Sequence, residues 1–353
     1  MPSAPLCAAH LKVSIMESGE MRPKTIVSLS PALDKDLRLH ACILCRAKRI
    51  YGEAYNDGKE LRDGNHLTGR RRESMDKVRR ERTGMNIIAV MGSPKGKGAG
   101  YKIVKMIEDR MKAMGDIEFK YLFLKEANLK LCTGCYQCMA RGEEKCPLKD
   151  NRAAIEIELL AADGVILSSP VYVANVSGLM KNFIDRFAYL NHRPRFHRQK
   201  VLTVVNMAGG GQKETVSALK IGLGGARGTR VVHELAIATP PWLQTERAVA
   251  RKEQTIAAAA KEFYRACLDA SLPSPTLKGY IDFLMMQRLA IECRQYLPAD
   301  YEFYKGRAYY FDASVNPIKA VAAKAIVGFM MNIWTKNMGP GNVAWPVAKK
   351  EKE

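Results

Sequence analysis

The chain has 353 residues and a hydrophobic fraction of 47%, which is enough to bury a large core and excludes a fibrous or low-complexity protein. Its formal net charge is +20 at pH 7, but acids interrupt the basic runs and no aromatics interleave them, which argues against a nucleic-acid partner and favours anionic cofactors. We find no apolar run near the roughly 18 residues of a transmembrane segment and no secretion signal, so we expect a cytoplasmic protein.

Residues 1–84 show no sustained hydrophobic period, and charged or glycine-containing stretches separate their short apolar bursts. This pattern is typical of a segment that cannot bury enough apolar surface to fold alone. We therefore expect a poorly ordered basic extension. Cys42 and Cys45 form a CxxC pair in it, and the lack of a second pair nearby disfavours a metal site there.

From residue 85 the pattern changes to apolar runs that alternate with helical periodicity. Five runs predict strands, at 86–92, 117–124, 164–172, 200–207 and 229–238. Helical patterns lie between them, at 101–114, 152–163, 177–190 and 213–223. Several strands are continuously apolar, which indicates a parallel sheet covered on both faces. We predict an α/β, doubly wound domain with a five-stranded parallel sheet over residues 85–240.

Residues 241–353 show no further strand pattern. They contain three helical patterns, at 245–270, 278–296 and 316–337, so we expect a helical C-terminal extension. One face of the last helix carries Val321, Ala325, Phe329 and Ile333. This face either packs on the parent domain or a partner subunit, or it rests on a membrane surface with the help of Lys319, Lys324 and Lys336.

The loop after the first predicted strand reads GSPKGKGAG, residues 92–100, and opens the first predicted helix. Glycines let backbone amides surround an anion, and a helix N-terminus adds partial positive charge. The spacing matches neither GxGxxG nor a Walker loop, and it suits a monophosphate. The alternative is a strand-to-helix turn that needs glycine only for its shape. The candidate phosphate-binding residues are Ser93, Lys95, Lys97, Gly98, Ala99 and Gly100.

Ligands of doubly wound sheets bind beyond the carboxyl ends of the strands, so the loops SPVYVANVSG (169–178) and NMAGGG (206–211) are also candidates. Tyr172 offers an aromatic face, Ser177 is a good helix N-cap, and bare glycine backbone can approach a flat ring. The alternatives are that Tyr172 packs between helix and sheet and that NMAGGG is a flexible turn. The candidate residues are Pro170, Val171, Tyr172, Val173, Asn175, Ser177, Ala208, Gly209 and Gly210.

Four of the nine cysteines lie in CTGCYQCMARGEEKCP, residues 132–147. In a reducing compartment, clustered cysteines more often bind metal or perform redox chemistry than form structural disulfides. Zinc sites usually combine two separated pairs, whereas CxxCxxC with a later Cys-Pro suits an iron–sulfur cluster. The spacing therefore favours a 4Fe–4S cluster over zinc or a disulfide, with the ligands Cys132, Cys135, Cys138 and Cys146.

In this order, the three motifs GSPKGKGAG, CTGCYQCMARGEEKC and SSPVYVANVSGLMKNFIDR resemble the flavodoxin-like NAD(P)H-dependent FMN reductase family, specifically its iron–sulfur flavoprotein branch. The resemblance covers about residues 85–240. It implies a flavodoxin-like fold, a homo-oligomer, and noncovalent FMN with its phosphate at residues 93–100 and its ring against PVYVANVSG and MAGGG. Ala99 and Gly100 stand where the family usually has Asn-Thr, so phosphate binding would depend on backbone amides, Ser93 and the lysines. Many reductases of the wider family resemble the chain around CTGCYQC yet are described as flavin-only, so free thiols are an alternative to the cluster.

We therefore predict an FMN-dependent oxidoreductase that passes electrons from NAD(P)H through FMN, with a 4Fe–4S cluster, to a quinone, a nitro compound or a ferredoxin-type partner. No catalytic acid or base is required, because the cofactor supplies the chemistry. Three histidines are either proton donors or structural residues: His192, His197 and His233. The stretch HRPRFHR contains Arg193, Arg195 and Arg198. These arginines form either a binding site for the phosphates of the nicotinamide cofactor or a solvated connector. The alternative functions are a ferredoxin-linked electron carrier without NAD(P)H turnover and a zinc-dependent regulator that binds nucleic acid.

Overall fold

The computed structural model describes residues 12–17, 20–25 and 84–339. It contains two units, 1–62 and 63–353. In the first unit, β1 (Lys12–Glu17) and β2 (Glu20–Thr25) pair in antiparallel fashion. The sequence did not predict this strand pair. The rest of the expected N-terminal extension, including the Cys42 and Cys45 pair, lies outside the described residues.

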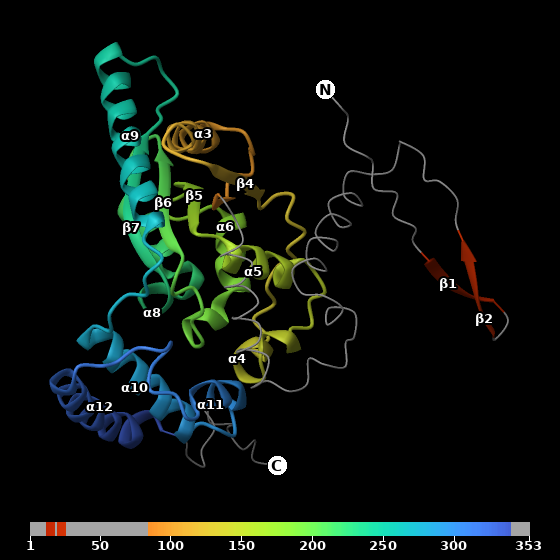
Figure 1. Cartoon of the computed structure of the whole chain (residues 1–353), viewed down its shortest axis with the longest axis vertical. Coiled ribbons are helices and arrows are strands. Elements are labelled where there is room, and N and C mark those ends of the chain that lie inside the picture. Colours follow the sequence, from red (N-terminus) through yellow and green to blue (C-terminus); the bar gives the residue numbers. More distant parts are fainter. Residues whose placement is uncertain (1–11, 18–19, 26–83, 340–353) are drawn as a thin grey trace, which may run out of the picture. The chain divides into compact units, whose positions relative to one another are not determined.

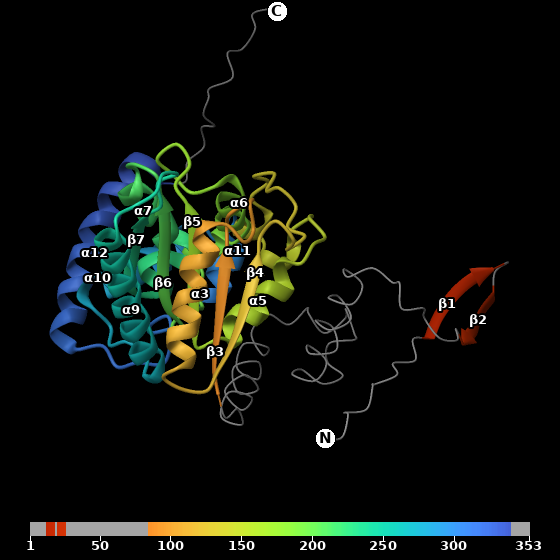
Figure 2. The ribbon, with the colours of Figure 1, turned by 90° about the horizontal axis from the view of Figure 1, so that it is seen from above.

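The second unit contains a five-stranded parallel sheet in the order β4-β3-β5-β6-β7 (Figure 1 and Figure 2). Its strands are β3 (Met85–Met91), β4 (Ile117–Phe123), β5 (Gly164–Pro170), β6 (Lys200–Met207) and β7 (Arg230–Ala238). Numbered along the chain within this sheet, the order is 2-1-3-4-5, which is that of the flavodoxin-like doubly wound fold. The predicted fold class is confirmed. The direction of winding reverses between β3 and β5, where such sheets bind ligands.

Helices cover both faces of the sheet (Figure 2). One layer comprises α5 (Arg152–Ala161), α6 (Gly178–Arg186) and α7 (Gln212–Ile221). The other comprises α3 (Ala99–Lys112) and α9 (Glu246–Leu268). Alternate residues of β3 point to opposite layers, and every residue of β5 is buried. Burial on two faces explains why these strands read as continuous apolar runs.

Helix α9 extends the sheet domain beyond the boundary that we predicted at residue 240. Phe263 is fully buried in the same core cluster as α3 and β6 residues. A Cβ atom built on Gly164 would lie 2.7 Å from the Phe263 ring and 2.6 Å from Cys267 Sγ, so α9 passes directly over the start of β5. The helical extension that is separate from the sheet therefore begins after Leu268.

This extension contains α10 (Leu277–Glu292), α11 (Pro298–Tyr304) and α12 (Pro317–Met338). The three helices surround their own core, which is rich in aromatic side chains. At its centre, Phe283 meets the edge of Tyr310 with the ring centroids 5.1 Å apart. The C-terminal extension is thus helical, as predicted.

Helix α12 packs on α10 through the face that carries Ala323, Val327 and Met331. The face that we singled out from the sequence is exposed instead, including Val321, Ala325, Phe329 and Ile333. By length and composition alone, α12 is apolar enough to cross a membrane, with a mean hydropathy of 1.2. The expectation that the chain has no transmembrane segment stays a prediction. Apolar residues surround the helix, so their period does not reveal which side is covered.

Glu108 connects α3 to the neighbouring strand β4. Its buried carboxylate accepts hydrogen bonds from Lys112 Nζ at 2.6 Å, Lys105 Nζ at 3.1 Å and the Tyr121 hydroxyl at 2.7 Å. Burial alone would raise the pKa of Glu108, but these donors outweigh it and hold the pKa below its ordinary value of 4.5. The carboxylate therefore stabilises the helix that begins in the candidate phosphate loop, residues 92–100.

We expect Glu108→Gln to lower the free energy of unfolding by about 1–3 kcal/mol at neutral pH. Because the folded-state pKa is lowered, the carboxylate contributes fully above the unfolded-state pKa, and the contribution is lost as the pH falls through the folded-state value. Denaturant titrations at neutral pH and at about pH 3 should therefore show a smaller difference in stability between the two proteins in acid. Asp109→Asn, at an exposed ion pair on the same helix, is the control and should cost about 0.5 kcal/mol or less. An equal loss at both pH values would contradict the assignment.

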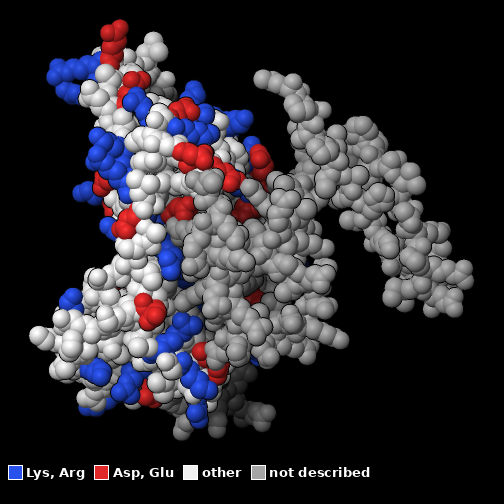
Figure 3. Space-filling model, viewed as in Figure 1, with Lys and Arg blue, Asp and Glu red and all other residues white. Residues whose placement is uncertain are grey.

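Lys and Arg side chains are interspersed with Asp and Glu on the described part of the face shown in Figure 3.

Candidate functional site

Three loops meet at the carboxyl ends of β3, β5 and β6. The Gly92 N–H donates to the Ser168 carbonyl at 2.8 Å, and the Val171 N–H donates to the Asn206 carbonyl at 2.9 Å. The Ser177 hydroxyl donates to the Gly92 carbonyl at 2.5 Å. These bonds bring together the loops that we predicted from the sequence as candidate sites, at the point where the sheet reverses its winding.

The first loop leaves the N-terminus of α3 open. Gly98 is the N-cap; no side chain caps the helix, and its first turn contains no acidic residue. The first amides of an α-helix have no partner within the helix, so they are available to an anion. Lys95 and Lys97 are exposed beside them, whereas Ser93 is buried and its Oγ accepts a hydrogen bond from the Lys95 N–H at 3.3 Å.

Two residues that the sequence did not single out join this loop. A Cβ atom built on Gly100 would lie 2.9 Å from Asn206 Oδ1, and this oxygen is buried with no hydrogen-bond partner among the described residues. Gly96 has a φ of +65°, and Lys125 Nζ lies 2.8 Å from the position of a Cβ atom there. The available signals were weak: Asn206 is a polar residue at the end of an apolar strand, and Lys125 follows the second predicted strand.

The second loop turns sharply and exposes its tip. The backbones of Tyr172 and Asn175 exchange hydrogen bonds of 2.8 and 3.0 Å, while Val173 and Ala174 have φ values of 49° and 54°. A positive φ is rare for a β-branched residue and costs free energy, and such strain is concentrated at functional sites. Tyr172 is 41% exposed, so it does not pack between helix and sheet.

The third loop packs against the second. A Cβ atom on Gly211 would lie 2.7 Å from Ala174 Cα, whereas one on Gly178, Gly209 or Gly210 would meet nothing within 4 Å. The glycines at 209 and 210 and Ala208 are exposed, so this part of the backbone is open to a ligand.

The remaining predicted residues of the second loop mainly hold it in place. Ser177 is buried and caps α6, because its Oγ accepts from the Met180 N–H at 3.2 Å. Pro170 is buried and Val171 is half-buried, while Asn175 Oδ1 accepts from the Val176 N–H at 2.8 Å.

The arrangement fits a mononucleotide with a flat ring. The amides at the start of α3 and the three lysines Lys95, Lys97 and Lys125 suit a phosphate group. The unpaired Asn206 Oδ1 suits a ligand hydroxyl, because a buried acceptor is normally hydrogen-bonded. The open backbone at 208–210 and the exposed Tyr172 can flank an aromatic ring.

Residues 132–147, which we call the cysteine segment, contact α6. The Cys132 N–H donates to Asn182 Oδ1 at 2.9 Å, and Asn182 Nδ2 donates back to the Lys130 carbonyl at 3.3 Å. Cys135 is exposed, and the other three thiols are half-buried. Burial raises the pKa of Cys138, and the charges of Cys146, Cys132 and Cys135 raise it further.

The thiols do not converge on a common point. No three His, Cys, Asp or Glu side chains within the described ranges are arranged to hold a metal ion. The order of the four cysteines along the chain nevertheless suits an iron–sulfur cluster, whose ligands are cysteine thiolates. Cys146 Sγ instead accepts a hydrogen bond from Arg186 at 2.9 Å, and Arg186 forms a buried bidentate pair with Asp150 at 2.7 Å. The cluster stays a prediction.

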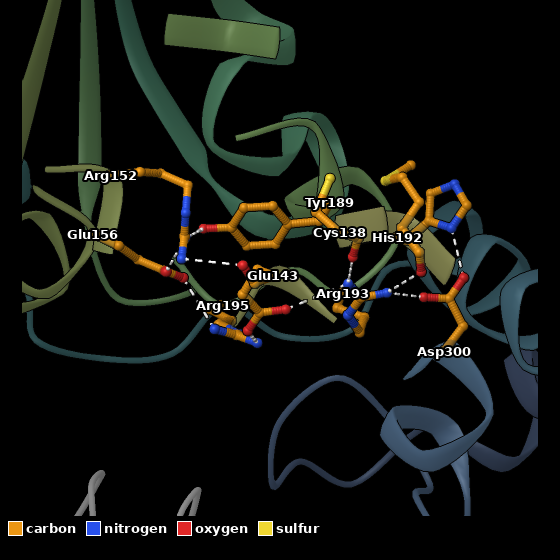
Figure 4. Close-up of polar contacts among 10 residues, drawn as sticks. Cys138, Glu143, Arg152, Glu156, Tyr189, His192, Arg193, Arg195 and Asp300 are labelled. Carbon is orange, nitrogen blue, oxygen red and sulfur yellow. Dashed lines mark hydrogen bonds and ion pairs between the residues drawn. The ribbon is translucent and has the colours of Figure 1, made fainter. Parts of the chain in front are cut away.

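A network of ion pairs includes Glu143, which belongs to the cysteine-containing residues 132–147 (Figure 4). Glu143 pairs with Arg193 at 3.3 Å and also with Arg195. Burial alone would raise the pKa of Glu143, but the two guanidiniums outweigh it and lower the pKa to about 2. Arg195 also pairs with Glu156 at 3.0 Å, and Glu156 pairs with Arg152 at 2.9 Å.

This network corrects both interpretations of HRPRFHR. Arg193 and Arg195 form internal ion pairs, so they are neither a site for nicotinamide phosphates nor a solvated connector. The third arginine, Arg198, is half-buried.

The three histidines have structural partners. His192 Nδ1 lies 2.6 Å from Asp300 Oδ2, and the buried His197 lies 4.9 Å from Phe311 between ring centroids. His233 Nδ1 lies 2.6 Å from Glu262 Oε2 of α9.

Comparisons with known proteins concern the same part of the chain. Residues 85–242 match the family model described as NADPH-dependent FMN reductase. An iron–sulfur flavoprotein of Archaeoglobus fulgidus is 32% identical over 133 residues, covering 38% of this chain and 59% of that protein. One of Methanocaldococcus jannaschii is 35% identical over 102 residues, covering 29% and 51%.

The chain thus spans between about half and three fifths of the length of these two curated relatives. Among solved structures, the apo form of an NADH:FMN oxidoreductase aligns with a TM-score of 0.38 and 18% identity, over 54% of this chain and 91% of its own.

Proposed function

We propose that the protein is an FMN-dependent NAD(P)H oxidoreductase, because residues 85–242 match the family model described as NADPH-dependent FMN reductase and are similar to iron–sulfur flavoproteins. The uncapped N-terminus of α3 is the observation that carries this proposal. Through Gly100 the start of this helix lies beside the unpaired Asn206 Oδ1, while Lys95 and Lys97 belong to the loop that precedes the helix and Lys125 Nζ lies near Gly96 of the same loop. FMN carries a phosphate on a polyhydroxylated chain. The phosphate suits the helix amides and the lysines, and a hydroxyl of the chain suits the buried Asn206 Oδ1.

The residues of the chain bind and orient the FMN cofactor and the nicotinamide substrate. The loop at 93–100 holds the phosphate, and the strained turn at Val173 and Ala174 presents backbone groups to the edge of the ring. Tyr172 flanks the ring and leaves space for a nicotinamide, since its side chain is partly exposed. Bound FMN supplies the hydride-transfer chemistry between NAD(P)H and the acceptor.

We also propose that Cys132, Cys135, Cys138 and Cys146 bind a 4Fe–4S cluster. Support comes from the order of the thiols and from the similarity to proteins named iron–sulfur flavoproteins. Metal binding often organises ligands that are not preassembled. In anaerobically purified protein we expect iron and acid-labile sulfide in equal amounts, and a loss of both in Cys135→Ser. Zinc without sulfide would contradict the cluster.

We expect NADPH or NADH to bleach the flavin absorbance of the FMN-loaded protein under anaerobic conditions. A quinone or a nitro compound should restore it, in line with a small-molecule acceptor. Flavin that is reduced only by a ferredoxin would support the alternative of an electron carrier without NAD(P)H turnover. A protein that binds no FMN would contradict both functions.

A further inference from the structure

We propose that Asp300, in the C-terminal extension, is a positioning residue for the cysteine segment and acts through Arg193 on the backbone carbonyls of Cys138 and Met139 (Figure 4). Asp300 lies on α11, outside the residues that match the reductase family. The extension would thereby complete a site that belongs to the sheet domain.

The first step is the contact between Asp300 and the segment that precedes β6. Asp300 is buried; its Oδ1 accepts a hydrogen bond from Arg193 Nη1, and its Oδ2 lies 2.6 Å from His192 Nδ1. Tyr304, also on α11, donates from its hydroxyl to the His192 carbonyl at 2.5 Å. Side chains of helix α11 therefore contact the side chains of His192 and Arg193 and the backbone carbonyl of His192.

The second step is the contact between Arg193 and the cysteine segment. Nη1 donates to the Met139 carbonyl at 3.1 Å, and Nη2 donates to the Cys138 carbonyl and contacts Glu143 Oε2 at 3.3 Å. These carbonyls belong to the short helix α4 (Gln137–Ala140), whose last carbonyls have no partner within the helix. A guanidinium can serve both carbonyls and a carboxylate at once, because its donors form a planar fork.

The third step is the mutual dependence of the two charges. The Arg193 side chain is 3% exposed and that of Asp300 is 1% exposed. Removing one member of a buried pair leaves the other charge uncompensated, which is strongly unfavourable. Without Asp300, Arg193 would move toward Glu143 or toward water and release the carbonyls of Cys138 and Met139. The backbone around Cys138 would then open more often.

The importance of this contact for electron transfer rests on the proposed function, but the contact itself can be measured without it. We expect Asp300→Asn in the full-length protein to accelerate amide hydrogen exchange at residues 137–146 about tenfold. Cys138 should also be alkylated faster by iodoacetamide. Exchange in the buried strand β5 and alkylation of the buried Cys267 should not change, whereas a general loss of stability would accelerate all four.

Asp282→Asn is the matched control, because this aspartate of the same extension pairs with the exposed Lys278. It should leave exchange at 137–146 unchanged. Asp300→Glu keeps the charge and should restore exchange to within about threefold of the wild type. If Asp300→Asn does not fold, Arg193→Lys tests the same contact, because it keeps the positive charge but loses the forked donation to the two carbonyls. Wild-type exchange at 137–146 in either folded variant would overturn the proposal.

Discussion

Replacing Gly98 by aspartate is expected to weaken FMN binding by roughly 30- to 150-fold in a protein that remains folded. Gly98 has extended backbone angles, φ −79° and ψ −157°, and a Cβ atom there would meet only Lys95, at 3.5 Å or more. Aspartate is a favourable N-cap, so stability should not fall. Its charge would repel a phosphate bound at this helix N-terminus, and two like unit charges about 5 Å apart at an effective dielectric constant of about 20 repel each other by about 3 kcal/mol.

Gly98→Asn is the control for this experiment. Asparagine has the same shape and also caps the helix, so the difference between the two variants isolates the effect of charge. Riboflavin lacks the phosphate and should bind both variants equally. Flavin fluorescence titrations measure all four affinities. If Gly98→Asp bound FMN as tightly as Gly98→Asn, the phosphate would have to bind elsewhere.

Phe263→Ala should lower the free energy of unfolding of the sheet domain by about 3–5 kcal/mol. The ring is fully buried between α9 and the sheet and lies directly over Gly164. Its removal leaves a cavity, and the loss is a large share of the roughly 5–15 kcal/mol by which domains are stable. Denaturant unfolding followed by circular dichroism measures the change.

Leu268→Ala, at the end of the same helix, is the control. Leu268 is 62% exposed, so its truncation should cost less than about 1 kcal/mol. If the two variants lost the same small amount, α9 would not be part of the sheet domain, and the boundary predicted at residue 240 would stand.

Much of this protein could be predicted from its sequence, because the relevant signals are local. The alternation of apolar strands with helical periods predicted the five-stranded sheet and its cover on two faces. The phosphate loop is contiguous, since its glycines and lysines all lie within residues 92–100. Ser177 was recognisable as an N-cap from its place before a helical pattern, and it caps α6.

Tertiary structure decided which distant groups meet. Asn206 and Lys125 reach the phosphate loop only because β6 and β4 end at the same edge of the sheet as β3. Arg193 and Asp300 are 107 positions apart, and a buried ion pair leaves no periodic trace in either segment. The exposed face of α12 was also undetectable, because apolar side chains on both sides of a helix show that it can be buried but not where. Hydrophobic period reports local burial, whereas the identity of a partner depends on how the elements pack.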